Sequence, residues 1–118
     1  IEHLTGPERI HFMDELWRVL KPGAKATITT PYWTSHRAVQ DPTHVFPPIC
    51  EQSYLYFDRV WREANKLDYY PITANFTFVY SFVLDPDIGF PDDAAAKQAT
   101  QFYNNVVDDL EVILTREA

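Results

Sequence analysis

The stretch that decides the fold is residues 15–31, ELWRVLKPGAKATITTP. Its first part has apolar residues at the i, i+3, i+4 spacing of an amphipathic helix, at Leu16, Val19 and Leu20. Lys21-Pro22-Gly23 predicts a sharp stop, because proline cannot continue the helix and glycine tolerates a left-handed turn. Residues 25–30 then have the β-branched composition of a buried strand. A helix that leads through a tight turn into a strand is half of a βαβ crossover, the unit of parallel α/β sheets.

Working outward, the spacing of apolar residues and turn signals predicts the other elements. Two strands are expected, at residues 25–30 and 75–84. Helices are expected at residues 7–20, 51–66 and 92–104. Residues 31–50 begin at Pro31, contain Pro42, Pro47 and Pro48, and are expected to form a long loop; loops of this length are often functional. Residues 109–115 fit a helix by periodicity and a strand by alternation, so the residues leave both open.

The aromatic residues of the second half stand at helix or strand spacing. That spacing favours core positions over a stacking platform for bases or sugars. The residues concerned are Tyr54, Tyr56, Phe57, Tyr69, Tyr70, Phe76, Phe78, Tyr80 and Phe82.

Composition restricts the class of protein. The chain has 118 residues, enough for one domain at most, and a hydrophobic content of 46% is ample for a packed core. A net charge of −7 gives no electrostatic footprint for nucleic acid or for an anionic membrane. Cys50 is the single cysteine, which excludes an intrachain disulfide and fits a reducing, cytoplasmic location. No apolar run is long enough for a membrane span, and no signal-peptide pattern opens the sequence.

Two short motifs carry a family resemblance. The first motif is Glu15-Leu16-x-Arg18-Val19-Leu20-Lys21-Pro22-Gly23. It resembles the junction in class I S-adenosylmethionine-dependent methyltransferases that joins the helix after the fourth strand to the fifth strand. Glu2-His3-Leu4 is similar to what those enzymes carry just after the fourth strand. The two matches stand in the family's order and at about its spacing. One departure is Ala24, where the family usually has a second glycine.

The resemblance implies the C-terminal half of a Rossmann-like methyltransferase sheet: strands five, six and seven with flanking helices. It also makes residues 109–115 a strand, antiparallel to the others and lying between them. The three glycines form no G-x-G cluster, so the Gly-rich loop that holds the donor has no counterpart. Residues 1–118 are therefore expected to be a partial methyltransferase domain that lacks the N-terminal donor-binding half.

The implied function is methyl transfer from S-adenosylmethionine to an unidentified acceptor, with this chain inactive by itself. A small-molecule acceptor fits the acidic composition better than nucleic acid does. The alternatives are a non-catalytic remnant or binding module with a methyltransferase-like fold, and a self-sufficient α/β domain whose junction is coincidental. With strand four missing, residues 25–30 would present an open edge, which predicts self-association.

Candidate site residues follow the carboxyl ends of parallel strands, where ligands bind in open α/β sheets. Glu2 and His3 occupy the position that lies beside the methyl donor in the family, so the resemblance implies cofactor binding. The loop after the fifth strand helps to shape the substrate site in the family. The residues of this loop that we assign to the substrate are Pro31, Tyr32, Trp33, His36 and Arg37.

The part of that loop that most clearly indicates chemistry is Asp41-Pro42-Thr43-His44. His44 can act as a general base at neutral pH, with Asp41 orienting it, while Arg37 can pair with an anionic substrate. The competing interpretation is that Asp41-Pro42 only starts a turn and that His44 lines the substrate mouth. His36 and His44 with Asp41 offer too few clear ligands to predict a metal site. Cys50 has no basic neighbour in sequence and receives no catalytic role.

Overall fold

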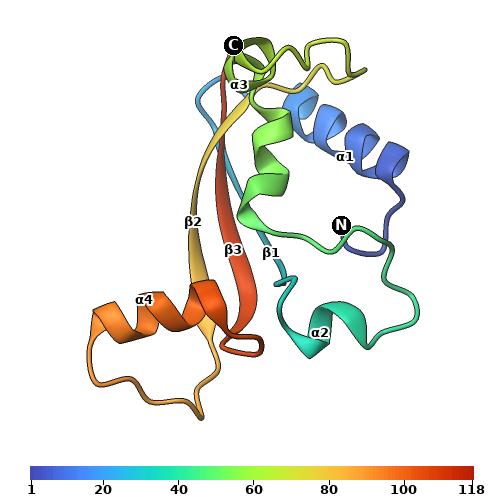
Figure 1. Ribbon diagram of the computed structural model, residues 1–118. Helices are drawn as coiled ribbons and strands as arrows, with labels where there is room; N and C mark the ends of the chain where they lie inside the picture. Colours follow the sequence, from blue (N-terminus) through green and yellow to red (C-terminus); the bar gives the residue numbers. More distant parts are fainter.

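The fold is built on a three-stranded sheet. The computed structural model describes all 118 residues. The order of elements is α1 (Gly6–Val19), β1 (Lys25–Pro31), α2 (His36–Val39), the 3₁₀ helix η1 (Glu51–Phe57), α3 (Arg59–Ala64), β2 (Phe76–Leu84), α4 (Asp93–Phe102) and β3 (Val107–Arg116). The strand order is β1-β3-β2, and β3 runs antiparallel to both neighbours (Figure 1). The protein is therefore an α/β domain in which the last strand lies in the middle, as expected.

One face of the sheet carries the core. Ile28 of β1 and Tyr80 of β2 both lie opposite Val112 of the central strand, and Ala26 and Phe78 flank Leu114 in the same way. Leu110, Val112 and Leu114 are fully buried. The covering side chains come from α1 and η1, as Met13, Tyr54 and Phe57. Figure 1 shows α1 beside the strands and α3 at the end of the sheet, next to the C-terminus.

The opposite face is open along the two outer strands. Thr27 and Thr29 of β1 are exposed on it. On β2, Val79 retains 64% of its accessible surface. This face is therefore less covered than the face that carries the core.

The junction in residues 15–31 forms as its sequence predicts. Thr5 and Glu8 make a reciprocal capping box at the start of α1, and Pro7 stands in the first turn. Gly23 adopts the left-handed region with φ of 80°, and its N–H donates to the carbonyl of Arg116 at 2.8 Å. The predicted helix 7–20 and strand 25–30 are confirmed to within one residue at each end.

Three sequence predictions need correction. The single helix at residues 51–66 is wrong, because Asp58 ends η1 and starts α3 by accepting from the N–H groups of Val60 and Trp61 at 2.9 and 3.2 Å. The loop 31–50 contains one helical turn, α2, which Ser35 caps. The last helix ends at Phe102 rather than residue 104. The strand alternative for residues 109–115 is confirmed as β3.

The aromatic residues divide between core and surface. Tyr54, Phe57 and Phe76 are buried, as predicted. The core prediction is wrong for four tyrosines, which retain 37–74% of their accessible surface: Tyr56, Tyr69, Tyr70 and Tyr80. Tyr69 and Tyr70 stack on each other with ring centroids 4.9 Å apart, so part of their apolar area is covered locally. The phenolic oxygen lets a tyrosine keep one end in water, which periodicity does not report.

Candidate functional site

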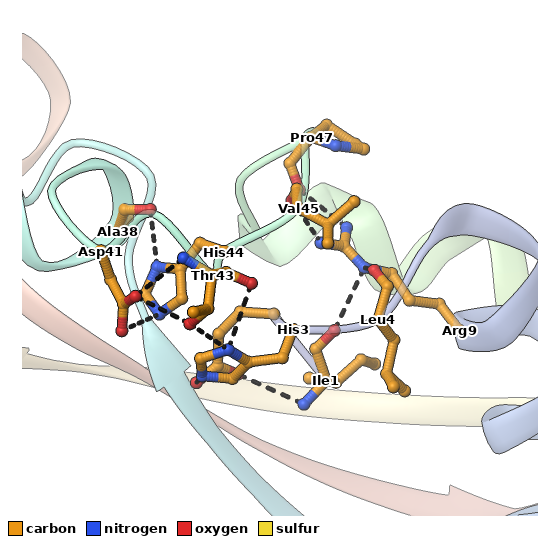
Figure 2. Close-up of polar contacts among 11 residues, drawn as sticks. Ile1, His3, Leu4, Arg9, Ala38, Asp41, Thr43, His44, Val45 and Pro47 are labelled. Carbon is orange, nitrogen blue, oxygen red and sulfur yellow. Dashed lines mark hydrogen bonds and ion pairs between the residues drawn. The ribbon is translucent and has the colours of Figure 1, made fainter.

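Residues 1–4 and the loop after α2 are fastened together by Arg9. Its guanidinium donates to the carbonyls of Val45 and Pro47 at 2.8 and 2.7 Å. Its Nε donates to the carbonyls of Leu4 and Ile1 at 3.0 and 3.2 Å (Figure 2). The N–H of Val45 also donates to the carbonyl of Glu2 at 2.9 Å. These contacts place Glu2 and His3 against the loop that carries Asp41 and His44.

The two histidines predicted for different roles meet at this point. The ring centroids of His3 and His44 lie 4.7 Å apart in an edge-to-face arrangement. His3 Nδ1 lies 2.9 Å from Thr43 Oγ1, which lies 2.7 Å from Asp41 Oδ1. An ionised carboxylate only accepts, so the Thr43 hydroxyl donates to Asp41 and accepts from His3 Nδ1–H. Thr43 thereby links His3, the candidate for cofactor binding, to Asp41, a candidate catalytic residue.

His44 is also fixed through its Nδ1. That atom lies 2.9 Å from the carbonyl of Ala38, which can only accept, so Nδ1 carries the hydrogen. In the neutral ring the lone pair is then on Nε2, which lies 3.6 Å from Asp41 Oδ2. The His44 side chain is 11% exposed and that of His3 is 50% exposed. A ring held in this way presents a defined nitrogen toward the cluster.

Two carboxylates give the cluster negative charge. For Asp41, hydrogen bonds from the backbone N–H and the hydroxyl of Thr43 lower the pKa. For Glu2, partial burial acts to raise the pKa, but a hydrogen bond from its own backbone N–H and the neighbouring N-terminal ammonium lower it overall. Both groups are therefore ionised at neutral pH. The negative charge of these two carboxylates favours a bound cation at this position.

Tyr32 and Trp33 line a separate pocket of about 380 Å³ at the end of β1. Tyr80 and Phe82 of β2 supply further aromatic walls, and the Tyr32 and Phe82 ring centroids are 5.0 Å apart. The hydroxyl of Tyr32 donates to Glu51 Oε2 at 2.8 Å. Burial and this hydrogen bond raise the pKa of Tyr32, so its hydroxyl stays protonated. The rest of the lining is mostly polar and includes Glu51, Lys97 and Gln101, so aromatic walls and polar groups share this pocket.

The other predicted substrate residues have different surroundings. Both oxygens of Asp109 accept from Arg37 Nη1 at 2.8 Å, so the charge of Arg37 is already paired. His36 is exposed at the start of α2, where its backbone N–H donates to Asn105 Oδ1. Pro31 ends β1 opposite Asp109. Substrate binding by Pro31, His36 and Arg37 therefore stays a prediction without a shared cavity to support it.

Sequence reasoning missed three residues of these sites. Thr43 bridges His3 and Asp41, and the Asp-x-Thr spacing of an Asx turn was the signal that could have found it. Arg9 and Glu51 have no such signal, because their partners lie 38 and 19 residues away in sequence. The metal ligands considered from sequence also do not form one group. Instead, Glu2, His3 and His44 each offer a ligand atom within 4.8 Å of the others.

No protein-family model, no curated protein and no solved structure matches this chain. None of the helices combines the length and the apolar character that crossing a membrane requires.

Proposed function

We propose that this chain is the C-terminal part of a class I S-adenosylmethionine-dependent methyltransferase domain. The observation that carries the proposal is the strand order β1-β3-β2, with β3 antiparallel to both neighbours. In the family, the seventh strand is inserted in this way between strands five and six. The order supports the proposal because Glu2-His3-Leu4 comes before α1 and Lys21-Pro22-Gly23 comes directly before β1, which would be strand five.

The open parts of the sheet also support the proposal. β1 is an edge strand, and Thr27, Thr29 and Val79 are exposed on the face opposite the core. In a whole domain, strand four would pair with β1 and further helices would cover that face. A donor-binding half supplied by another segment would therefore complete both surfaces.

The chemistry proposed here is an in-line displacement at the sulfonium methyl group of the donor. The protein's part in such a step is alignment and, where the acceptor requires it, a base. Glu2 and His3 would face the donor, and Tyr32 and Trp33 would hold a small-molecule acceptor. His44, whose Nε2 lies 3.6 Å from Asp41 Oδ2, is the candidate base. A cytoplasmic setting fits the single cysteine and the nature of the donor.

Titration of S-adenosylmethionine into the 118-residue chain, followed by NMR, tests the proposal. Without a Gly-rich loop, the affinity should be weaker than about 1 mM, a binding free energy weaker than about −4 kcal/mol. The ring signals of His3 should still shift, because that residue would lie beside the donor. His11 is exposed on α1 and serves as the internal control, whose signals should not move.

The outcomes separate the alternatives. Shifts of the His3 ring signals that persist in His36→Ala, with no shift at His11, support a donor-side position. No shift at any donor concentration favours a non-catalytic remnant. Micromolar binding would contradict the claim that the main donor-binding elements are absent.

Self-association is the partner prediction that accompanies this proposal. β1 has one unpaired edge, and such edges pair with other chains. Light scattering should report a mass that rises with protein concentration. Thr27→Lys should reduce the association, because charged residues protect edge strands, whereas Ser81→Lys on β2 should reduce it less. A stable monomer at high concentration would argue for a self-sufficient domain instead.

A further inference from the structure

We propose that Glu2, His3 and His44 form a binding site for a divalent transition-metal ion, with Zn²⁺ as the best-suited ion. The three residues come from two segments about 40 positions apart, the start of the chain and the loop before η1. One ligand atom from each lies within 4.8 Å of the others. Figure 2 shows the two imidazoles turned toward one another beside this cluster.

The hydrogen bonds around the rings are those that a metal site requires. His3 Nδ1 donates to Thr43, and His44 Nδ1 donates to the carbonyl of Ala38 at 2.9 Å. Each neutral ring therefore has its lone pair on Nε2. Metal-binding histidines almost always donate their other ring N–H to a carbonyl, carboxylate or similar acceptor, which fixes the tautomer and the orientation of the ring. Both rings are held in this way without a metal being required to hold them.

The ligand set indicates which class of ion is favoured. Two imidazole nitrogens and one carboxylate suit Zn²⁺ and similar first-row ions, whereas Mg²⁺ and Ca²⁺ prefer all-oxygen sites. Three protein ligands leave a fourth position of a tetrahedral ion for water or another small ligand. Glu2 and the neighbouring Asp41 also supply negative charge to offset that of the ion.

The N-terminal ammonium and Asp41 lie close to the proposed ligand atoms, but neither occupies all of them. The N-terminal ammonium of Ile1 lies 3.3 Å from Glu2 Oε2, while Glu2 Oε1 faces His3 Nε2 at 3.8 Å. Asp41 Oδ2 lies 3.6 Å from His44 Nε2, and the other oxygen of Asp41 accepts from Thr43. Asp41 is therefore not a ligand itself: it holds Thr43 in place, and Thr43 in turn holds the His3 ring.

Metal binding does not rest on methyl transfer. The Nε2 lone pair of His44 can accept a proton or bind a metal ion, so a bound ion would replace the base role of this residue. Calorimetry with the metal alone detects binding whatever reaction the complete domain performs. The failure of one proposal is thus separate from the failure of the other.

Calorimetric titration of the 118-residue chain with Zn²⁺, and of the same chain with Co²⁺ followed by visible absorption, tests the site. We expect one ion per chain and a higher thermal midpoint in excess metal, because a ligand that binds only the folded state stabilises it. His3→Ala and His44→Ala should each weaken binding by more than about 100-fold, beyond the range typical of outer-residue changes. His11→Ala and His36→Ala, the other two histidines, are the matched controls and should bind as the parent does.

The test remains valid even if His44→Ala fails to fold, because two other variants probe the same site. His3 is half exposed, so His3→Ala should leave the circular dichroism spectrum unchanged even if the more buried His44→Ala does not. Thr43→Val keeps all three ligands and removes the acceptor for His3, and it should weaken binding by about 10–100-fold. The proposal is overturned if the parent chain binds no ion, if His3→Ala binds as the parent does, or if His36→Ala loses as much affinity as His3→Ala.

Discussion

Two contacts in this molecule are held by different forces. The contact between α1 and the sheet buries apolar side chains, with Met13, Val112 and Leu114 fully inaccessible. The contact between residues 1–4 and the loop 41–47 is polar, and Arg9 alone donates to four backbone carbonyls across it. Burial is non-directional and tolerates small shifts, whereas hydrogen bonds require defined distances and angles. The apolar contact therefore supports the fold, and the polar contact sets the geometry of the candidate site.

The largest effect should come from the apolar contact. Leu114→Ala removes a fully buried side chain at the centre of β3 and should lower the free energy of unfolding by about 2–5 kcal/mol. Val79→Ala, on the open face, should change it by less than about 0.5 kcal/mol. Urea denaturation of both variants measures the difference. Equal effects would mean that the open face is covered in solution.

The polar contact should be weaker but still measurable. Arg9→Met keeps much of the apolar stem and leaves the carbonyls of Val45 and Pro47 without their donor. We expect a loss of about 1.5–3 kcal/mol in the free energy of unfolding, the range for hydrogen bonds to charged groups. Arg18→Met removes an exposed, solvent-screened ion pair with Glu15 and should therefore cost clearly less than Arg9→Met does. If the two arginine variants are indistinguishable, Arg9 does not fasten the loop.

A backbone change at the junction tests the turn itself. Gly23→Ala places a side chain at φ of 80° and should cost about 1–2 kcal/mol. Gly89 has no close neighbour and no left-handed φ, so Gly89→Ala is the matched control and should not destabilise the protein. Thermal or urea unfolding compares them. A neutral Gly23→Ala would remove the conformational explanation of the helix stop.

The smallest effect concerns the capping box of α1. Hydrogen bonds from the hydroxyl and backbone N–H of Thr5 lower the pKa of Glu8. The folded state thus prefers ionised Glu8, so its contribution is present above the ordinary pKa of glutamate and is lost as the pH falls through the lowered value. Glu8→Gln should flatten the decline of stability below about pH 4.5. Parallel acid titrations of parent and variant would refute this if their slopes agree.

The contrast also explains what the sequence could predict. Pro22, Gly23 and the apolar spacing before them are local signals, so α1, the turn and β1 were predictable to within a residue. The break at Asp58 was not, because the same aromatic spacing fits one helix or two short ones. The approach of His3 to His44 depends on Arg9 and Thr43, whose partners lie far away along the chain. Hydrogen bonds of this kind leave no periodic pattern.

The central claim is that the start of the chain and the loop before η1 form one site in which His3 and His44 are in contact. A nuclear Overhauser spectrum of the 118-residue chain tests it directly. The ring centroids are 4.7 Å apart, so cross-peaks between the ring protons of the two histidines are expected, and Tyr32 and Phe82 at 5.0 Å provide the reference for an intact fold. Cross-peaks for both pairs would agree with the account. A clear Tyr32–Phe82 cross-peak with none between His3 and His44 would contradict it.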